Sequence, residues 1–169
     1  RNKATAKGSK GKELDPRFFD EIEWEKFHEA CVNTAQSVSK VLSPVHTIVA
    51  ISRGGLVPAR IMAEHIKSEH FVTMGIKLYD GDKRGKQISV YQDLPDHLSQ
   101  YRDRNLLVID DISDGGTTFK FAVDRIRQRT NYNVFTAAPY IKKSTKFIPD
   151  FYVTEFPDDE WIVFPFEKD

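Results

Sequence analysis

The sequence predicts a single α/β domain: a parallel sheet with helices on both faces. Two short apolar runs rich in β-branched residues, 46–51 and 106–109, have the pattern of buried strands. Helical periodicity fills the stretches around them, so that strands and helices alternate along the chain. The 169 residues include 40% hydrophobic side chains, enough to bury one core. This composition excludes a fully disordered chain and a disulfide- or metal-stapled miniprotein.

The individual elements follow in order from the same patterns. Apolar residues recur every three or four positions from about 23 to 42, which predicts a first helix that ends at Ser43-Pro44. The strand 46–51 follows, and after the turn at 52–55 Pro58 suits the first turn of a helix that continues to Ile66. Further predicted elements are strands at 71–78, 106–109, 133–138 and 151–153, and a helix at about 117–129.

The stretch 79–104 differs from the rest of the chain because it is dominated by charged residues, with Gly81, Gly85 and Pro95 among them. Only residues 88–91 have the character of a strand. A polar connection this long inside a compact domain predicts a functional lid or a mobile loop.

The charges are unevenly distributed along the chain. Lys and Arg total 25, as do Asp and Glu, so the formal net charge is zero. Residues 1–12 contain basic residues and no acidic ones, and they offset a net charge of −5 over residues 13–169. We expect a flexible basic tail at 1–14, either a functional arm or a remnant of expression or proteolysis, before an acidic domain at 15–169. A dedicated nucleic-acid binder usually has a basic excess, so we expect no nucleic-acid partner.

Several further site classes are disfavoured. Cys31 is the only cysteine, which excludes an internal disulfide and a multi-cysteine zinc site and fits a reducing cytoplasm. No apolar run approaches the roughly 20 residues of a membrane span, so we expect a cytoplasmic protein without a membrane partner. The histidines, at positions 28, 46, 65, 70 and 97, lack metal-site spacing, and we expect His65 and His70 at the surface.

The densest group of chemically active residues follows the strand 106–109. Three acidic residues leave the strand, and paired glycines and threonines lead into the next helix: Asp110, Asp111, Asp114, Gly115, Gly116, Thr117 and Thr118. Glycines allow a close backbone approach, and free N–H groups at a helix start bind a phosphate monoester. The carboxylates would repel phosphate and suit ribose hydroxyls and a hard cation. The group predicts a sugar-phosphate site, with an acidic helix cap as the plainer alternative.

Residues Val108–Thr118 resemble the phosphoribosyl-diphosphate (PRPP) signature of type I phosphoribosyltransferases. Gly115 stands where that signature usually has Thr, and Thr117 where it has its second Gly, so the phosphate-binding hydroxyl is expected to move by one position. The resemblance implies the type I phosphoribosyltransferase fold, with a lid loop at about 79–104 and a small C-terminal hood at about 154–169. It also implies that ribose and 5-phosphate are bound by Asp110, Asp111, Ser113, Asp114, Gly115, Gly116, Thr117 and Thr118.

The resemblance continues at three other segments. Ser52, Arg53 and Gly54 match the pyrophosphate-binding turn of 6-oxopurine phosphoribosyltransferases, especially the bacterial xanthine-guanine type, in which the Ser-Arg peptide tends to be cis; an ordinary turn is the alternative.

Lys142 matches the lysine that reaches the purine 6-oxo group in that family, with Lys143 one register away. Trp161 matches the hood aromatic residue that stacks on the base in that family, and core packing is the alternative for it. The backbone of Ile162 would contact the edge of the base. Val163 and Glu167 depart from the xanthine-guanine pattern, which leaves the preferred base open.

The resemblance implies a Mg²⁺-dependent enzyme of purine salvage that transfers 5-phosphoribose from PRPP to xanthine, guanine or hypoxanthine and releases pyrophosphate. Asp114 would act as the base at purine N7, while Asp110 and Asp111 would hold the ribose hydroxyls and the metal. A homodimer or homotetramer is expected. Three basic residues of the lid would either meet the diphosphate or form a solvated charge cluster: Lys83, Arg84 and Lys86.

Two alternative functions stay open. One is a non-catalytic regulator that senses PRPP or a nucleotide on the same fold. The other is a phosphoribosyltransferase for a different base.

Overall fold

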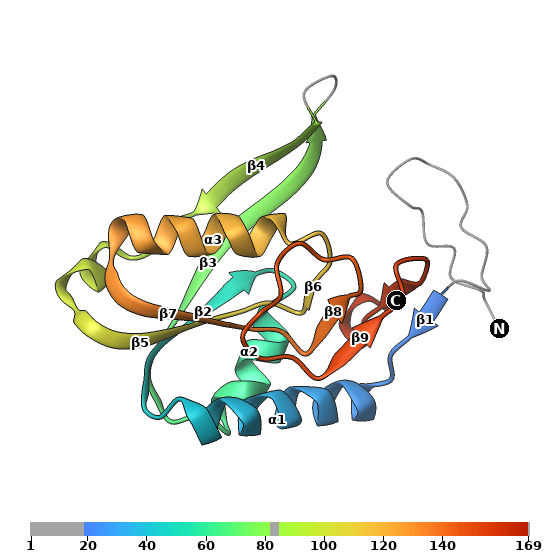
Figure 1. Ribbon diagram of the computed structural model, residues 1–169, viewed down its shortest axis with the longest axis horizontal. Helices are drawn as coiled ribbons and strands as arrows, with labels where there is room; N and C mark the ends of the chain where they lie inside the picture. Colours follow the sequence, from blue (N-terminus) through green and yellow to red (C-terminus); the bar gives the residue numbers. More distant parts are fainter. Residues whose placement is uncertain (1–18, 82–84, 169) are drawn as a thin grey trace.

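Five strands form the central sheet, in the order β4-β3-β2-β5-β7 (Figure 1). The computed structural model describes residues 19–81 and 85–168, and the predicted tail at 1–14 lies outside them. The strands are β2 (Val45–Ser52), β3 (Ser68–Gly81), β4 (Gly85–Gln92), β5 (Arg102–Ile109) and β7 (Asn131–Ala137). Strand β4 runs antiparallel to β3, and the other pairs in this sheet are parallel.

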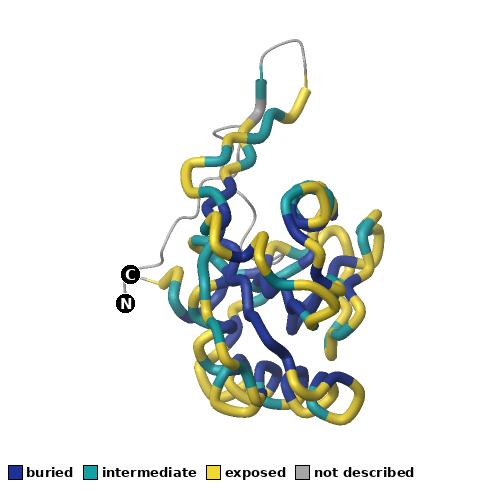
Figure 2. Tube along the Cα trace, turned by 90° about the vertical axis from the view of Figure 1, so that its left-hand side faces the viewer, coloured by how far each residue is buried: buried dark blue, intermediate teal, exposed yellow. Residues whose placement is uncertain are grey.

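Helices cover both faces of this sheet. Helices α1 (Trp24–Val41) and α2 (Leu56–Ala63) lie on one face, and α3 (Thr117–Arg129) lies on the other (Figure 1). Ile48 of β2 packs towards α1 and α2, whereas its neighbour Val49 packs towards α3. Because successive strand side chains point to opposite faces, continuous apolar runs are needed to fill both layers. The buried residues follow the centre of the sheet in Figure 2, and the predicted α/β class is confirmed.

Short strands build the C-terminal part. Strands β6 (Ile112–Ser113), β8 (Tyr140–Lys142) and β9 (Thr154–Phe156) form a small parallel sheet, while β1 (Phe19–Glu21) pairs with β10 (Trp161–Val163). The ring of the fully buried Phe27 on α1 lies 6.4 Å from the Tyr140 ring and 5.5 Å from the Phe166 ring. Aromatic packing therefore holds the C-terminal segment, including the turn η3 (Pro165–Glu167), against α1.

The segment predicted as a lid loop is mostly regular structure. Strand β3 extends to Gly81, β4 returns from Gly85 to Gln92, and a 3₁₀ turn, η2, covers Asp96–Gln100. The paired outer parts of β3 and β4 project from the body (Figures 1 and 2). In β4, Ile88 and Val90 alternate with polar residues, which is the two-residue periodicity of a strand. The alternation is short and lies among many charged residues, so the sequence alone indicates a strand only weakly. Lys83 and Arg84 lie outside the described residues.

Other boundaries also differ from the expectation. The predicted strand 151–153 is reduced to one bridge between Ala137 and Phe151, and the strand itself lies at 154–156. Helix α2 contains Pro58 in its first turn, as predicted, but ends at Ala63 rather than Ile66. Within the described part of the chain, none of the helices combines the length and the apolar character that a membrane crossing requires.

Candidate functional site

Two chain reversals meet at the carboxyl edge of the sheet. Ala50 of β2 is paired with Ile109 of β5, so the turn at 52–55 and the segment after β5 lie next to each other. A Cβ atom on Gly54 would lie only 2.5 Å from the Asp111 carboxylate oxygen Oδ2. A side chain at this position would therefore displace the Asp111 carboxylate. The Ser52–Arg53 peptide is cis, as the family resemblance implied.

The acidic pair after β5 lies against this turn, with Asp110 buried and Asp111 partly buried. The Asp111 N–H donates to Asp110 Oδ1 at 2.8 Å, and the Ile112 N–H donates to Asp111 Oδ1 at 2.7 Å. Burial raises the pKa of Asp110 well above its ordinary value, and the neighbouring charge of Asp111 adds to the rise. Burial also raises the pKa of Asp111 to about 6, with a smaller contribution from Glu167. A divalent cation would relieve this repulsion, and the carboxylate oxygens fit the preference of Mg²⁺.

A tight backbone loop precedes α3. Gly116 has a φ of 91°, and a Cβ atom there would lie 2.6 Å from the backbone nitrogen of Phe147. The Phe147 ring stacks on Phe119 of α3 at 5.4 Å, and the Lys146 N–H donates to the Gly115 carbonyl at 3.2 Å. The loop 145–147 therefore braces the start of α3, where the first N–H groups have no helical acceptor. We refer to residues 113–118 as the phosphate loop.

One pocket contains the whole predicted ribose-phosphate set. It has a volume of about 230 Å³ and is lined by Asp110–Thr118 together with Leu78, Lys86 and Phe119. A larger cavity of about 520 Å³ lies between α1 and β9, but acidic residues of the segment 20–29 line much of it. Such a lining disfavours a polyanion, so the smaller pocket is the candidate phosphate site.

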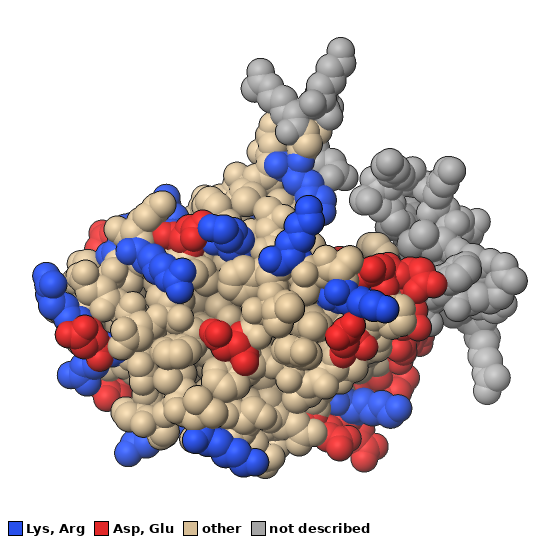
Figure 3. Space-filling view, in the orientation of Figure 1, with Lys and Arg blue, Asp and Glu red and all other residues tan. Residues whose placement is uncertain are grey.

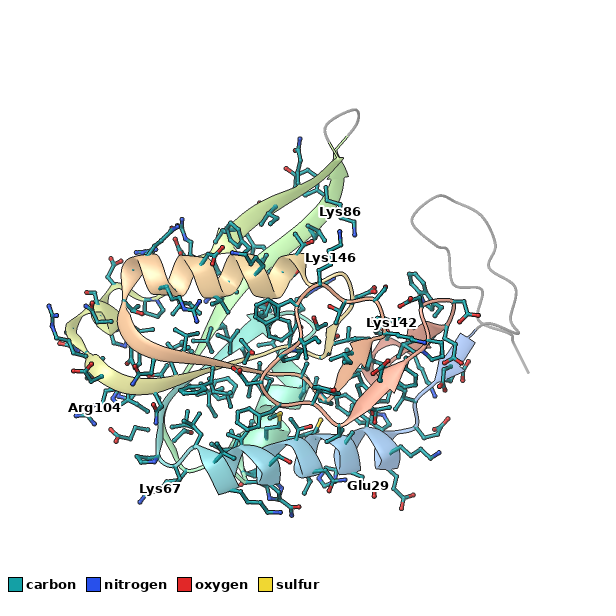
Figure 4. All side chains as sticks on the ribbon, viewed as in Figure 1. Glu29, Lys67, Lys86, Arg104, Lys142 and Lys146 are labelled. Carbon is teal, nitrogen blue, oxygen red and sulfur yellow. The ribbon has the colours of Figure 1, made fainter. Side chains whose placement is uncertain are left out.

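Two lysines flank the phosphate loop. The Lys86 Nζ atom, from β4, lies 3.9 Å from the position that a Cβ on Gly115 would take. Lys86 and Lys146 lie beside the start of α3 in Figure 4, and basic side chains gather at the base of the hairpin in Figure 3. Lys86 was one of the candidates in the sequence. Lys146 was missed, because it lies in a segment without regular structure.

The hydroxyl of Ser113 is used inside the protein. Ser113 is buried, its hydroxyl donates to the Phe147 carbonyl at 2.6 Å, and it lies 2.9 Å from the Thr145 hydroxyl. Its side chain therefore supports the 145–147 loop. Asp114, by contrast, is exposed at the rim of the pocket.

The predicted base-binding residues lie in the hood. Strand β8 pairs with β6, which places Lys142 one residue beyond the Ser113–Ile141 pair. Lys142 is buried, and its ammonium donates to the carbonyl of Pro157 at 3.2 Å and to that of Glu160. Trp161 is 45% exposed, which argues against core packing, whereas Ile162 is buried. Lys143 is exposed.

Tyr91 of β4 links the hairpin to the turn at 52–55. Its hydroxyl lies 3.0 Å from both the carbonyl oxygen and the hydroxyl of Ser52, so it can donate to the carbonyl and accept from the Ser52 hydroxyl. Its ring packs on Gly75, where a Cβ atom would approach within 2.4 Å. The sequence carries no signal for this role of Tyr91, because the link joins strands that are not neighbours in the chain.

A phosphate loop at a helix start, beside an acidic pair and a glycine turn on one sheet edge, is the arrangement of a type I phosphoribosyltransferase. The family model of the phosphoribosyl transferase domain matches residues 20–169, and the chain belongs to this family.

Solved structures share the fold. The purine phosphoribosyltransferase of Pyrococcus horikoshii is 22% identical, with a TM-score of 0.76 over 89% of this chain and 95% of that one. The xanthine-guanine-hypoxanthine phosphoribosyltransferase of Helicobacter pylori is 19% identical, with a TM-score of 0.70 over 88% and 93%. A hypothetical protein of Neisseria gonorrhoeae, solved with bound ppGpp, is 22% identical, with a TM-score of 0.76 over 89% of both chains.

The phosphate loop should respond very differently to the same substitution at its two glycines. Gly115→Thr adds a hydroxyl where the first heavy atom met by a Cβ is 3.9 Å away, so it should fold normally and tighten PRPP binding severalfold, by about 1 kcal/mol. Gly116→Thr places a side chain at positive φ against Phe147 and should weaken PRPP binding by more than about tenfold. Calorimetric titration with PRPP and Mg²⁺ compares the two, and equal effects would contradict this account of the loop.

The buried carboxyls should make the ligand-free protein less stable as pH rises through about 6. Their pKa values are higher in the folded than in the unfolded state, so the folded state binds more protons and this contribution to stability falls with increasing pH. Asp111→Asn should therefore raise the unfolding free energy at pH 8 by roughly 1–3 kcal/mol and change it little at pH 4. Urea unfolding at both pH values measures this, with the exposed Asp159→Asn as control. A gain that is the same at both pH values would rule out the charge explanation.

Removing the Tyr91 hydroxyl should loosen the 52–55 turn. Tyr91→Phe keeps the ring on Gly75 but loses the contact with Ser52, so the KM for PRPP should rise about threefold to tenfold with a smaller change in kcat. Tyr79→Phe, on the neighbouring strand, is the matched control. If Tyr91→Phe altered neither constant, the contact would have no part in ligand binding.

Proposed function

We propose that this protein transfers the 5-phosphoribosyl group of PRPP to a 6-oxopurine base (xanthine, guanine or hypoxanthine) and releases pyrophosphate, with Mg²⁺ as cofactor. The observation that carries the proposal is the contact of the 52–55 turn with the acidic pair beside the phosphate loop, in a chain of the phosphoribosyl transferase family. The fold likeness to a purine phosphoribosyltransferase and to a xanthine-guanine-hypoxanthine phosphoribosyltransferase supports the choice of a purine.

Different parts of the site would bind the 5-phosphate, the ribose hydroxyls and the diphosphate of PRPP. The phosphate loop offers backbone N–H groups and the hydroxyls of Thr117 and Thr118 to the 5-phosphate. Asp110 and Asp111 accept hydrogen bonds from the ribose hydroxyls. The exposed Arg53 and the backbone of the 52–55 turn face the diphosphate. When bound, Mg²⁺ supplies charge neutralisation for the leaving diphosphate, and Asp110 and Asp111 would hold it.

The hood receives the base. The exposed ring of Trp161 offers a face for stacking on the purine, and the Ile162 backbone lies beside it. The Lys142 ammonium is already at hydrogen-bond distance from the Pro157 carbonyl, and it would exchange one hood carbonyl for the purine O6. Asp114, exposed at the pocket rim, would take or hold the proton at N7.

The hairpin of β3 and β4 would cover the reacting sugar. Lys86 of β4 already lies against the phosphate loop, so closing of the hairpin would bring its charge towards the phosphates and exclude water. Water exclusion matters because hydrolysis of PRPP is the competing reaction. We propose that the enzyme works as a homodimer or homotetramer in the cytoplasm.

A panel of bases tests the proposal directly. The protein is incubated with PRPP, Mg²⁺ and, in turn, hypoxanthine, guanine, xanthine, adenine, orotate and uracil, and the nucleotide product is measured. Product with 6-oxopurines alone supports the proposal, and product only with another base overturns the choice of base.

The ppGpp bound to the Neisseria gonorrhoeae protein favours a second candidate, a nucleotide-sensing regulator. That candidate predicts PRPP or ppGpp binding without product from any base.

The role of Asp114 can be separated from PRPP binding. Asp114→Asn keeps the size of the side chain but cannot accept a proton, so turnover should fall by about 10²–10⁴-fold while the Kd for PRPP stays within about threefold. Steady-state kinetics and calorimetry measure the two quantities, with Asp124→Asn on α3 as control. Unchanged turnover would remove Asp114 from the mechanism.

A further inference from the structure

A second group of metal-ligating side chains lies at the opposite end of the sheet from the phosphate loop. His46 lies at the start of β2, and Glu69 and His70 lie at the start of the neighbouring β3. The parallel register pairs Thr47 with His70, which brings the three side chains together although β2 and β3 are separated by α2. In Figure 4, Lys67 and Arg104 mark this end of the sheet, and Lys86 and Lys146 mark the phosphate end.

The donor atoms are close enough for one ion. One ligand atom from each of His46, Glu69 and His70 lies within 4.8 Å of the other two. His46 Nε2 is 3.7 Å from Glu69 Oε2, and the two imidazole rings are centred 4.7 Å apart. Zn²⁺ with bonds of about 2.0–2.1 Å places its ligand atoms roughly 3.3 Å apart. The side chain of Glu69 is 61% exposed and can make this small closing movement around the buried His46.

The second nitrogen of His46 is already fixed by its surroundings. Its Nδ1 lies 2.9 Å from the Thr47 hydroxyl and 2.8 Å from the Tyr132 hydroxyl, and these two hydroxyls are 3.0 Å apart. An Nδ1–H that donates into this buried pair leaves the lone pair on Nε2, which faces Glu69. Ligating histidines usually have their other nitrogen held in this way, because it sets the tautomer and the ring orientation.

The charged groups near the cluster are Arg104, which repels a cation, and the Glu69 carboxylate, which offsets that charge. Two imidazoles and one carboxylate suit zinc rather than magnesium, and they leave a fourth position for water or for His97, whose ring is centred 6.1 Å from that of His70.

We propose that His46, Glu69 and His70 bind one zinc ion, or another first-row divalent ion that prefers imidazole, at the amino-terminal edge of the sheet. The ion would join β2 to β3 and would act as a structural site. The proposal does not depend on the reaction catalysed at the other edge.

Zinc titration of the full-length protein tests the site in the absence of PRPP. Protein freed of metal with a chelator should take up one equivalent of Zn²⁺ with a Kd of about 1 µM or tighter and should melt at a higher temperature. His70→Ala and Glu69→Gln alter partly exposed side chains, so both should fold, and each should weaken zinc binding by at least about tenfold. Tyr132→Phe should weaken binding less, because Thr47 still holds the ring. Circular dichroism checks the fold of every variant.

Two controls separate this site from other zinc ligands. His65→Ala removes an exposed histidine outside the cluster, and Asp111→Asn removes a carboxylate of the phosphate pocket; neither should change the zinc affinity. Co²⁺ offers a second readout, since its visible absorption should be lost in His70→Ala. Absence of saturable zinc uptake would overturn the proposal, and so would uptake that His70→Ala and Glu69→Gln leave unchanged.

Discussion

The parallel pairing of β2 with β5 brings two chemically different turns to the same edge of the sheet, and the site depends on this contact. The two strands are paired from Thr47 opposite Leu106 to Ala50 opposite Ile109. This register determines where the segment that follows each strand lies along the sheet edge. The glycine turn after β2 then approaches the carboxylate of Asp111 so closely that a methyl group on Gly54 would displace it. Apolar layers on both faces hold this register, since a slip by one residue would turn the β2 side chains to the wrong layers.

The same edge combines carboxylates with groups of positive charge. Asp110 and Asp111 lie side by side with little exposure, where desolvation favours protonation in the absence of a cation. The phosphate loop a few residues away presents backbone N–H groups, and Lys86 and Lys146 come to it from two other segments. Carboxylates and cationic groups therefore lie side by side in one pocket. The zero net charge of the chain gives no indication of this arrangement.

The two edges of the sheet have different chemistry because the strands are parallel. At the carboxyl edge the strands end in turns and a helix start, which expose backbone N–H groups. At the amino edge the first residues of adjacent strands lie together, and here they are imidazoles and a carboxylate backed by the hydroxyls of Thr47 and Tyr132. The second edge therefore offers imidazole nitrogens, whereas the first offers backbone N–H groups.

Local patterns in the sequence determined a large part of this protein. The periodicity of 23–42 and the apolar run 106–109 depend on neighbouring residues, and so does the signature 108–118, in which strand end, glycine loop and helix start are contiguous. Interactions between distant segments were decided only by the tertiary structure. The hairpin of β3 and β4, the Tyr91–Ser52 contact, the Lys142 contacts with the hood and the His46–Glu69–His70 group each join residues across a strand register or a crossover. Spacing along the chain does not encode these pairs, because the register between strands is set by the packing of the whole sheet against its helices.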